Sequence, residues 1–563
     1  MLDLKKLIDG MTVEEKIGQL AQFNANVFSG SDADITGPLV KNGLTGDDLY
    51  RIGSLLNFKD SKEMNELQKR HLEGDRNKIP MVFMMDVIHG YRTIFPIPLA
   101  LGGSFDTELV EECTRMSAVE ASSAGVQVTF TPMVDYVRDA RWGRVMETCG
   151  EEPILNGIMG AAQVKAFHGE DMSKFGGLAT CVKHYAAYGG AEAGRDYNQV
   201  ELSEHILREF YLPAYKACID AGVDSIMVGH YTFVDVDDTT VNGAYLPATL
   251  SEKVIKGLLR EKMGFEGVVL TDAVGMKSLT SIYPPEKLYV ELLRAGNDMI
   301  LGPESPWCID VIEKAVLSGD LPESRIDEAC TRILKMKEKY GLFDQGEIVP
   351  PTEERRKEIL DNTHVLCEKI AEKGLTLCAN RTGFLPLNKN NIKRVKIIYI
   401  GYLPACLDSI REYAVPEFEK YGATVSISDG YPMETGNSNV AEFDKATITD
   451  DNSDRNLESY DLIIYATYIG MHQPRGGPFF FGDKCTMMMK VMTKAPEKSI
   501  AVSFGCTDIF FNYFASSHTF INCYSYNRET MEAFVKGLYG DIQFTDYNPL
   551  PLNPIKRNDN VYG

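Results

Sequence analysis

Long apolar runs, paired cysteines and an excess of basic residues are all missing from this 563-residue sequence. No stretch of about 18 apolar residues occurs, so a membrane-spanning helix is not expected. The 58 Lys and Arg residues are outnumbered by 80 Asp and Glu residues, and the formal charge of -22 makes nucleic acid and anionic membranes poor partners. The 12 cysteines form no CxxC motif and no metal-type spacing, which predicts reduced thiols in the core.

Signals for cofactors and for export are missing as well. We find no cluster of metal-ligand residues and no glycine loop of the phosphate-binding type, so no cofactor is expected. The N-terminus leads into a helix and not into an apolar signal segment. These features predict a cytoplasmic protein that acts on a small molecule, and they leave the oligomeric state open.

Strands that alternate with helices organise the first part of the chain. A Thr cap at Thr12, followed by acidic residues, predicts an opening helix. Apolar strand-like runs then alternate with amphipathic segments such as 108–120, 201–221 and 251–262. The strand-like runs are residues 52–56, 81–85, 127–130, 178–182, 224–228, 268–271 and 298–301. The pattern predicts a (β/α)8 TIM-like barrel over residues 1–340.

A second alternating region follows a stretch rich in Gly, Pro and charged residues, which we interpret as a linker over residues 341–365. Its strand-like runs lie near residues 375–378, 395–401, 424–428, 462–468, 500–504 and 520–523. They predict an open α/β sandwich domain over residues 366–563.

Asp272 ends the most informative of the apolar runs, which reads Val-Val-Leu-Thr-Asp. A lone Asp after a strand is often only a turn or helix-cap residue. Here, however, other runs also lead to acids, bases or cations, at Asp86, Asp135, Lys183 and His230. Barrel enzymes gather their reactive groups at the C-terminal ends of strands, so this convergence predicts a catalytic site that contains Asp272.

Several short segments carry a family resemblance. They are Asp-Val-Ile-His-Gly-Tyr-Arg at 86–92, Ser-Phe-Asp at 104–106, Arg-Trp-Gly-Arg-Val-Met-Glu at 141–147, Lys-His-Tyr-Ala-Ala-Tyr-Gly at 183–189, Gly-Arg-Asp-Tyr-Asn at 194–198 and Gly-Phe-Glu-Gly-Val-Val-Leu-Thr-Asp at 264–272. Together they resemble glycoside hydrolase family 3, most closely its bacterial β-glucosidase branch. The likeness covers about the first 340 residues.

The resemblance implies a retaining exo-acting β-glycosidase, with a β-glucosidase on small soluble β-glucosides as the main hypothesis. It makes Asp272 the nucleophile that forms a covalent glycosyl-enzyme. It also implies that Asp86 accepts hydrogen bonds from the far hydroxyls of the terminal sugar, while Arg144, Lys183 and His184 bind the nearer ones. This mechanism requires no metal or organic cofactor.

His230 departs from the β-glucosidase pattern, which usually has Tyr at this substrate-binding position. A His in place of this Tyr favours a resemblance to the N-acetylglucosaminidases of the family. The alternative hypothesis is therefore a β-N-acetylglucosaminidase or a β-N-acetylglucosaminide phosphorylase. A third hypothesis, from another class, is a sugar-binding protein on a hydrolase scaffold, although an intact nucleophile argues against it.

The proton donor is missing from both places where the family keeps one. The second-domain loop at 469–483 contains no Glu, and residues 186–189 read Ala-Ala-Tyr-Gly in place of a His-containing motif. Glu192, on the loop after Lys183 and His184, is our first candidate, because burial can raise the pKa of a Glu enough for proton donation. The alternatives are His472, Asp483 and Glu434.

Structural roles compete with catalytic ones at five further positions. For Arg138, Arg141 and Glu147 the alternative is a buried ion-paired network that supports the barrel, and for Arg138 and Glu147 we prefer this network to direct contact with a sugar. Trp142 is a candidate for stacking on a sugar or for packing in the core. His89 is open between a site role and a structural one.

Overall fold

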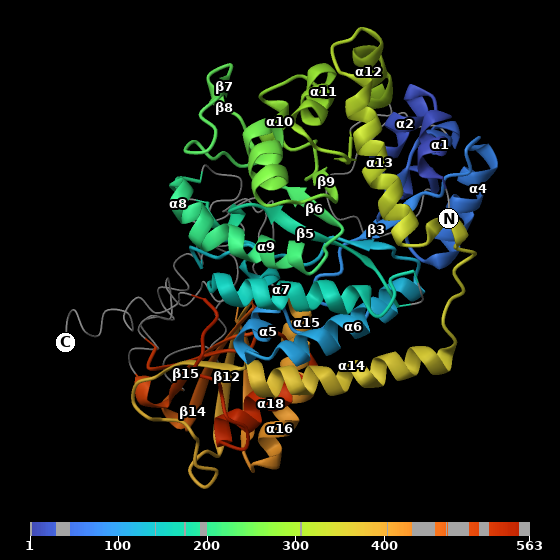
Figure 1. Cartoon of the computed structure of the whole chain (residues 1–563). Coiled ribbons are helices and arrows are strands. Elements are labelled where there is room, and N and C mark those ends of the chain that lie inside the picture. Colours follow the sequence, from blue (N-terminus) through green and yellow to red (C-terminus); the bar gives the residue numbers. More distant parts are fainter. Residues whose placement is uncertain are drawn as a thin grey trace, which may run out of the picture.

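The computed structural model describes residues 3–29, 46–140, 142–173, 176–191, 200–303, 307–401, 403–430, 457–468, 470, 495–505 and 517–550. Two sheets dominate this part of the chain, a barrel and a smaller open sheet beneath it in the view of Figure 1. The predicted combination of a TIM-like barrel and an α/β sandwich domain is confirmed.

The barrel contains eight parallel strands in the order β10-β1-β2-β3-β4-β5-β6-β9. A parallel bridge between Leu270 and Met299 brings the two ends of this sheet together. The strands are β1 (Ala21–Asn24), β2 (Ser54–Leu56), β3 (Val82–Met85), β4 (Val128–Thr129), β5 (Ala179–Tyr185), β6 (Ser225–Val228), β9 (Val268–Thr271) and β10 (Ile300–Leu301). All of these strands except β3, whose last residue is half-buried, are fully buried, as expected for a barrel covered by helices.

The helices between these strands follow the predicted amphipathic segments. Thr12 caps α2 (Val13–Gln19) in a capping box with Glu15, and α1 (Leu4–Asp9) precedes it. The main outer helices are α4 (Ser61–Gly74), α6 (Thr107–Ser123), α7 (Pro153–His168), α9 (Leu212–Asp220), α11 (Pro285–Ala295), α12 (Trp307–Leu317) and α13 (Glu323–Lys339). Residues Lys253–Lys262, predicted as part of an amphipathic helix, form a π-helix.

The second sheet has six strands in the order β11-β16-β15-β14-β12-β13. Only β11 and β16 pair antiparallel; the other neighbours are parallel. The strands are β11 (Thr376–Asn380), β12 (Arg394–Gly401), β13 (Thr424–Gly430), β14 (Leu462–Tyr468), β15 (Ser499–Ser503) and β16 (Thr519–Asn522). Helices α15 (Pro404–Ser409), α16 (Val415–Lys420) and α18 (Arg528–Tyr539) accompany them.

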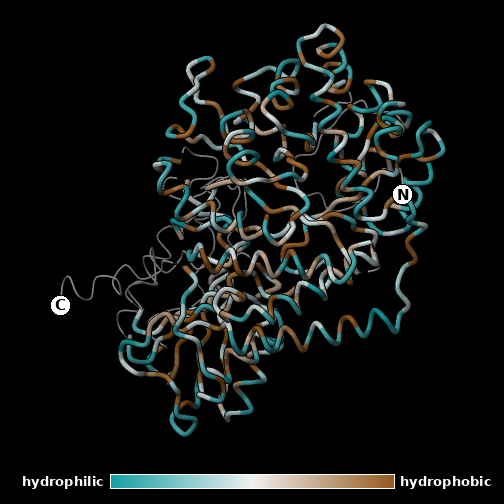
Figure 2. The backbone as a smooth tube through the Cα atoms, viewed as in Figure 1, coloured by the Kyte–Doolittle hydropathy of each residue, from teal (hydrophilic) through white to brown (hydrophobic). Residues whose placement is uncertain are grey.

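Helix α14 (Glu353–Gly374) begins inside the range predicted as a linker. It packs against α6 and α5 (Pro98–Ser104) of the barrel and against α18 of the second sheet (Figure 1). Hydrophilic residues run along much of α14 (Figure 2), while its buried residues, such as Ile359, Leu366 and Ile370, recur at helical spacing. The helix therefore joins one continuous apolar core that includes residues of both sheets. The domain boundaries at 340 and 365 stay a prediction.

Candidate active site

Asp272 lies directly after β9, the seventh barrel strand in chain order. Its backbone N–H donates to Val228 O at 3.0 Å, which ties the strand end to β6. Its carboxylate oxygen Oδ1 accepts a hydrogen bond from Ala273 N at 2.7 Å. The other oxygen, Oδ2, is buried and has no hydrogen-bond partner among the described residues. One oxygen is thus fixed by the backbone, and the other is available to react.

Lys183 and Asp86 form an ion pair across the strand ends. Lys183 is on β5 and Asp86 directly follows β3, and Lys183 Nζ lies 2.6 Å from Asp86 Oδ1. The Lys183 side chain is 5% exposed, whereas that of Asp86 is 26% exposed. The pair therefore offers a buried cation and a more accessible acceptor, as sugar hydroxyls require.

His184, the next residue on β5, is the centre of a chain of polar contacts. Its Nδ1 lies 3.0 Å from Asp135 Oδ2, and its backbone N–H donates to the same oxygen at 3.0 Å. On the other side of the ring, Nε2 lies 3.1 Å from Arg144 Nη1. Arg144 in turn makes two hydrogen bonds to Glu147, of 2.5 and 2.7 Å. The structure thus connects Arg144 and His184, two of the predicted sugar-binding residues.

Burial shifts the titration of both members of the Asp135–His184 pair. Desolvation raises the pKa of Asp135 to about 7, although the hydrogen bond from the His184 backbone, Arg144 and Tyr215 all favour the ionised form. Desolvation also lowers the pKa of His184 well below its usual value, and the positive charges of Arg144 and Lys183 act in the same direction. The imidazole is therefore neutral at physiological pH.

Aromatic side chains enclose this part of the site. The hydroxyls of Tyr215 and Tyr231 donate to His184 O at 2.5 and 2.7 Å. Tyr188 packs edge-on against the His184 ring, and the Arg144 guanidinium lies 5.5 Å from the Tyr188 ring centroid. Trp142 is 1% exposed and packs edge-on against Tyr188, which favours the core-packing alternative for this Trp.

His230 lies beside Asp272, but its ring nitrogens are engaged within the protein. Nε2 lies 3.0 Å from Ala273 O and Nδ1 lies 2.7 Å from Thr249 Oγ1. The residue is 2% exposed, and desolvation lowers its pKa, while the negative charge of Asp272 opposes that shift. This geometry supports the backbone next to Asp272; contact of His230 with a sugar stays a prediction.

The remaining sequence candidates have different outcomes. Arg138 is exposed, and among the described residues it donates to a backbone oxygen, Glu201 O, at 3.5 Å, which does not favour the buried ion-paired network for this residue. Glu147 does form a buried ion pair, with Arg144. His89 is held by Phe95 O at 2.8 Å and has its pKa lowered by burial. Glu192 lies outside the described residues, as do Arg141, Glu434, His472 and Asp483.

Three residues that contact His184 have no role predicted from the sequence: Asp135, Tyr215 and Tyr231. Asp135 was noted only as an acid that follows a strand, and its partner His184 is 49 positions away. The two tyrosines belong to apolar segments with no local signal of function. Only the three-dimensional contact with His184 identifies them.

The described part of the chain contains neither a cluster of metal ligands nor a helix that could span a membrane. No group of three or more His, Cys, Asp or Glu residues there is arranged to hold a metal ion. Within the same residues, no helix combines the length and apolar character needed to cross a membrane.

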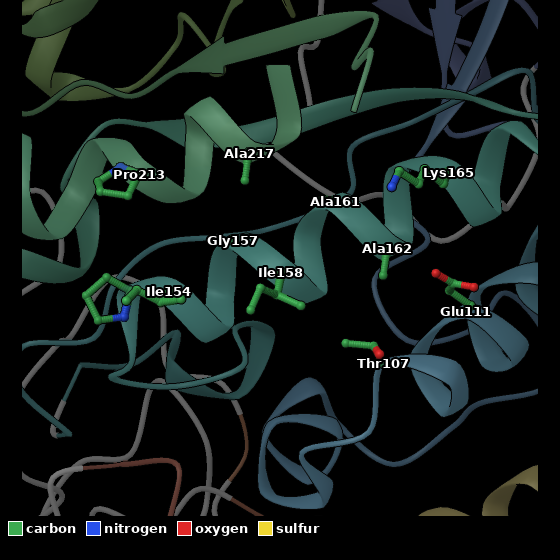
Figure 3. Close-up of a pocket in the computed structure, with 11 residues that line it drawn as sticks. Thr107, Glu111, Ile154, Gly157, Ile158, Ala161, Ala162, Lys165, Pro213 and Ala217 are labelled. Atoms are coloured by element: carbon green, nitrogen blue, oxygen red, sulfur yellow. The ribbon is translucent and has the colours of Figure 1, made fainter. Parts of the chain in front are cut away.

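The pocket in Figure 3 lies on the outer helices of the barrel and not at the strand ends. It has a volume of about 420 Å³ and is lined by residues of α6, α7 and α9, including Ile154, Ile158 and Ala217. None of the predicted site residues lines it. The candidate active site is therefore the group around Asp272.

Known proteins resemble the chain in both sequence and structure. The chain is 33% identical over 393 residues to the periplasmic β-glucosidase of Salmonella typhimurium, a match that covers 68% of this chain and 48% of that protein. The structure of a β-glucosidase from Listeria innocua in complex with isofagomine superposes with a TM-score of 0.79 at 28% identity, covering 96% of this chain and 75% of that one. A β-glucoside phosphorylase shares the fold, with a TM-score of 0.77 at 21% identity over 98% of this chain and 95% of that one.

The extent of these matches differs along the chain. The chain spans about half the length of the curated relatives it matches. A family model described as the glycosyl hydrolase family 3 N terminal domain matches residues 12–336, which include the whole barrel and every described residue of the site. The chain therefore belongs to glycosyl hydrolase family 3.

Proposed function

We propose that the protein is a retaining exo-β-glycosidase that releases terminal β-D-glucose from small β-glucosides through a covalent intermediate on Asp272. The observation that carries this proposal is the Asp272 carboxylate at a barrel strand end, with Oδ1 bonded to Ala273 N and Oδ2 buried without a partner among the described residues. A buried oxygen without a hydrogen bond is costly for folding, and nucleophilic attack explains why it is retained. The β-glucosidases among the relatives support the choice of glucosides.

In this mechanism Asp272 Oδ2 attacks the anomeric carbon and the bond to the leaving oxygen breaks. Water then cleaves the resulting ester and releases the sugar with retained configuration. Asp86 accepts hydrogen bonds from the far hydroxyls, and Lys183 and Arg144 donate to the nearer ones. Because ion pairs already hold both cations, the binding geometry exists before the sugar enters.

The proton donor completes the proposal. Retaining enzymes place the second group about 5 to 5.5 Å from the nucleophile. Glu192, which follows Lys183 and His184 in the sequence, remains our candidate, and Glu192→Gln tests it. The variant should lose most of its activity on an aryl glucoside with a poor leaving group and little on a dinitrophenyl glucoside, because the latter needs little proton donation. Equal losses on both substrates would reject Glu192 as the donor.

The nucleophile is tested with Asp272→Ala on 4-nitrophenyl β-glucoside. We expect kcat to fall by on the order of 10³ or more, because the covalent step is lost. Added azide should restore part of the activity by attacking from the vacated face. Trapping of the wild type with a slow 2-fluoro glucoside, followed by peptide mapping, should label Asp272. Full turnover in the variant, or a label elsewhere, would refute the assignment; Asp220→Ala, a change of an exposed Asp on α9, is the matched control.

Substrate choice and acceptor are tested in the same assay. Rates on the β-glucoside, the β-xyloside and the β-N-acetylglucosaminide are compared with and without phosphate. The proposal requires the highest rate on the glucoside and no dependence on phosphate. A preference for the N-acetylglucosaminide, which the His230 position suggests, would move the protein to the alternative function, and a requirement for phosphate would identify a phosphorylase.

A cytoplasmic location is part of the proposal. It is supported by ten buried cysteine thiols in the described part of the chain, as in proteins of reducing compartments. The relative from Salmonella typhimurium is named periplasmic, so fractionation of cells that express the full-length natural protein is the deciding test.

A further inference from the structure

We propose that Asp135 is a positioning residue, whose carboxylate holds His184 in the tautomer with a proton on Nδ1 and so leaves Nε2 as the acceptor that orients Arg144. The inference rests on the proposed function, because it assumes that Arg144 and His184 bind the sugar. It concerns a residue that does not itself belong to the group of predicted sugar ligands.

The donors and acceptors around the ring permit only one arrangement. Arg144 Nη1, 3.1 Å from His184 Nε2, can only donate a hydrogen bond, so Nε2 must accept and carry no proton. Asp135 Oδ2, 3.0 Å from Nδ1, is an acceptor, so Nδ1 must donate. Both ends of the ring therefore specify the same tautomer.

The carboxylate has room for a proton at one oxygen only. Oδ2 already accepts two hydrogen bonds from His184, one from Nδ1 and one from the backbone N–H. Oδ1 is 3.1 Å from the hydroxyl of Tyr215, and this hydroxyl also donates to His184 O at 2.5 Å. While Asp135 is ionised, the Tyr215 hydroxyl proton is shared between Oδ1 and His184 O. When Oδ1 carries a proton, it donates to the Tyr215 oxygen, and the Tyr215 proton then points to His184 O alone. Protonation changes the charge of the site but leaves the tautomer intact.

The surroundings of Asp135 set the pH at which its carboxylate takes up this proton. Burial raises the pKa of Asp135 to about 7 and keeps that of His184 well below its usual value. Among the described residues, titratable and charged groups from four elements face the pair. Lys183 lies on β5, and Arg144 and Glu147 follow β4. Tyr211 precedes α9 and Tyr215 lies on it, while His230 and Tyr231 follow β6. Below about pH 7 Asp135 is neutral, and the negative charge that it contributes near Arg144 is lost, while the ion pair of Arg144 with Glu147 remains.

Asp135→Asn reproduces the protonated form. The amide oxygen can replace Oδ2 and accept from both His184 groups, and the amide nitrogen can donate to the Tyr215 oxygen, as the acid proton would. Tyr215→Phe is the matched second variant. It removes a hydrogen bond that favours ionised Asp135, while Tyr231 still donates to His184 O at 2.7 Å.

The experiment is ¹⁵N NMR of the full chain labelled at histidine, with the His184 signals assigned by their loss in His184→Gln. In the wild type we expect a protonated Nδ1, a bare Nε2 and one inflection near pH 7 without formation of the imidazolium. Asp135→Asn should keep this tautomer and lose the inflection, and Tyr215→Phe should move the inflection to higher pH. A proton on Nε2, an imidazolium at pH 8 or an inflection that persists in Asp135→Asn would each overturn the proposal.

Kinetics on 4-nitrophenyl β-glucoside provide the second readout. In the wild type, kcat/KM should rise by a few-fold as the pH passes 7, because the ionised carboxylate of Asp135 restores a negative charge beside His184 and Arg144. Asp135→Asn should stay near the lower value and lack this step. If the NMR result is as expected but the wild type does not act on the glucoside, the proposed function fails and the tautomer assignment stands. If the enzyme is active but Asp135→Asn retains the step, the positioning role fails alone.

Discussion

Replacement of Asp298 by Asn should destabilise the barrel more than almost any other single change of charge. Asp298 is fully buried between β9 and β10. Its Oδ1 accepts from Arg325 and Arg332 at 2.6 and 3.1 Å, and its Oδ2 accepts from Arg260 at 2.6 Å and from the Val269 backbone at 3.0 Å. One carboxylate therefore faces three guanidinium groups, two of which also pair with Glu328, and it holds β9 three residues before Asp272.

The expected cost follows from burial. The Arg325 and Arg260 side chains are 9% and 13% exposed, so water screens them little once the carboxylate is gone. Removal of one partner from a buried ion pair costs about 3–5 kcal/mol. Because the entropy of unfolding is about 2.1 cal/mol/K per residue, that cost corresponds to a fall in Tm of roughly 2.5 to 4 °C for a cooperative unit of 563 residues.

Thermal unfolding monitored by near-UV circular dichroism measures the effect. Asp220→Asn is the control, because it breaks an exposed i,i+4 pair with Lys216 that contributes at most about 0.5 kcal/mol. A Tm of Asp298→Asn within about 1 °C of the control would show that the three arginines find other compensation, and the expected role of Asp298 would be wrong.

Two further predictions concern the loss of folding stability at acidic pH and the role of the buried Trp142. The hydrogen bond and charge of Arg76, together with the Thr12 capping contact, lower the pKa of Glu15 to about 2 against the opposing effect of burial. The stabilisation that ionised Glu15 contributes to the fold is therefore complete above about pH 4.5 and is lost as the pH falls toward 2. Glu15→Gln should reduce this acid-induced loss of unfolding free energy by at most about 1 kcal/mol, measured by urea unfolding at pH 6 and pH 3. Trp142→Phe should cost roughly 1–3 kcal/mol and leave KM nearly unchanged, because Trp142 is 1% exposed, and a KM raised tenfold would instead indicate sugar stacking.

Strand periodicity accounts for most of the fold that could be predicted. Runs rich in Val, Ile and Leu, such as those of β9 and β14, lie where the sequence predicts them. Strand β1 was not predicted, because Ala21–Asn24 contains no β-branched residue and directly follows a helix. The start of α14 was missed because Pro350 and Pro351 and the charged residues after them resemble a linker, although Thr352 caps the helix.

The candidate site was predictable where a reactive residue ends a strand, as Asp272, Asp86 and Lys183 do. Contacts between side chains were not, because they depend on distances that local sequence does not encode. Asp135 and His184 meet only after β4 and β5 are paired. The same reason explains why His230 could be placed near the site while its bond to Ala273 O could not be foreseen.

Helix α14 has a consequence for how the protein comes apart. Because Leu366, Cys367 and Ile370 belong to the same apolar cluster as Leu99 on the barrel side and Tyr465 on the second sheet, neither sheet has a complete core of its own on that side. Severing the chain after residue 340 would uncover that shared apolar surface, and such surfaces drive aggregation. In the intact chain, the barrel and the second sheet are therefore expected to melt in a single cooperative transition, as parts of one folding unit.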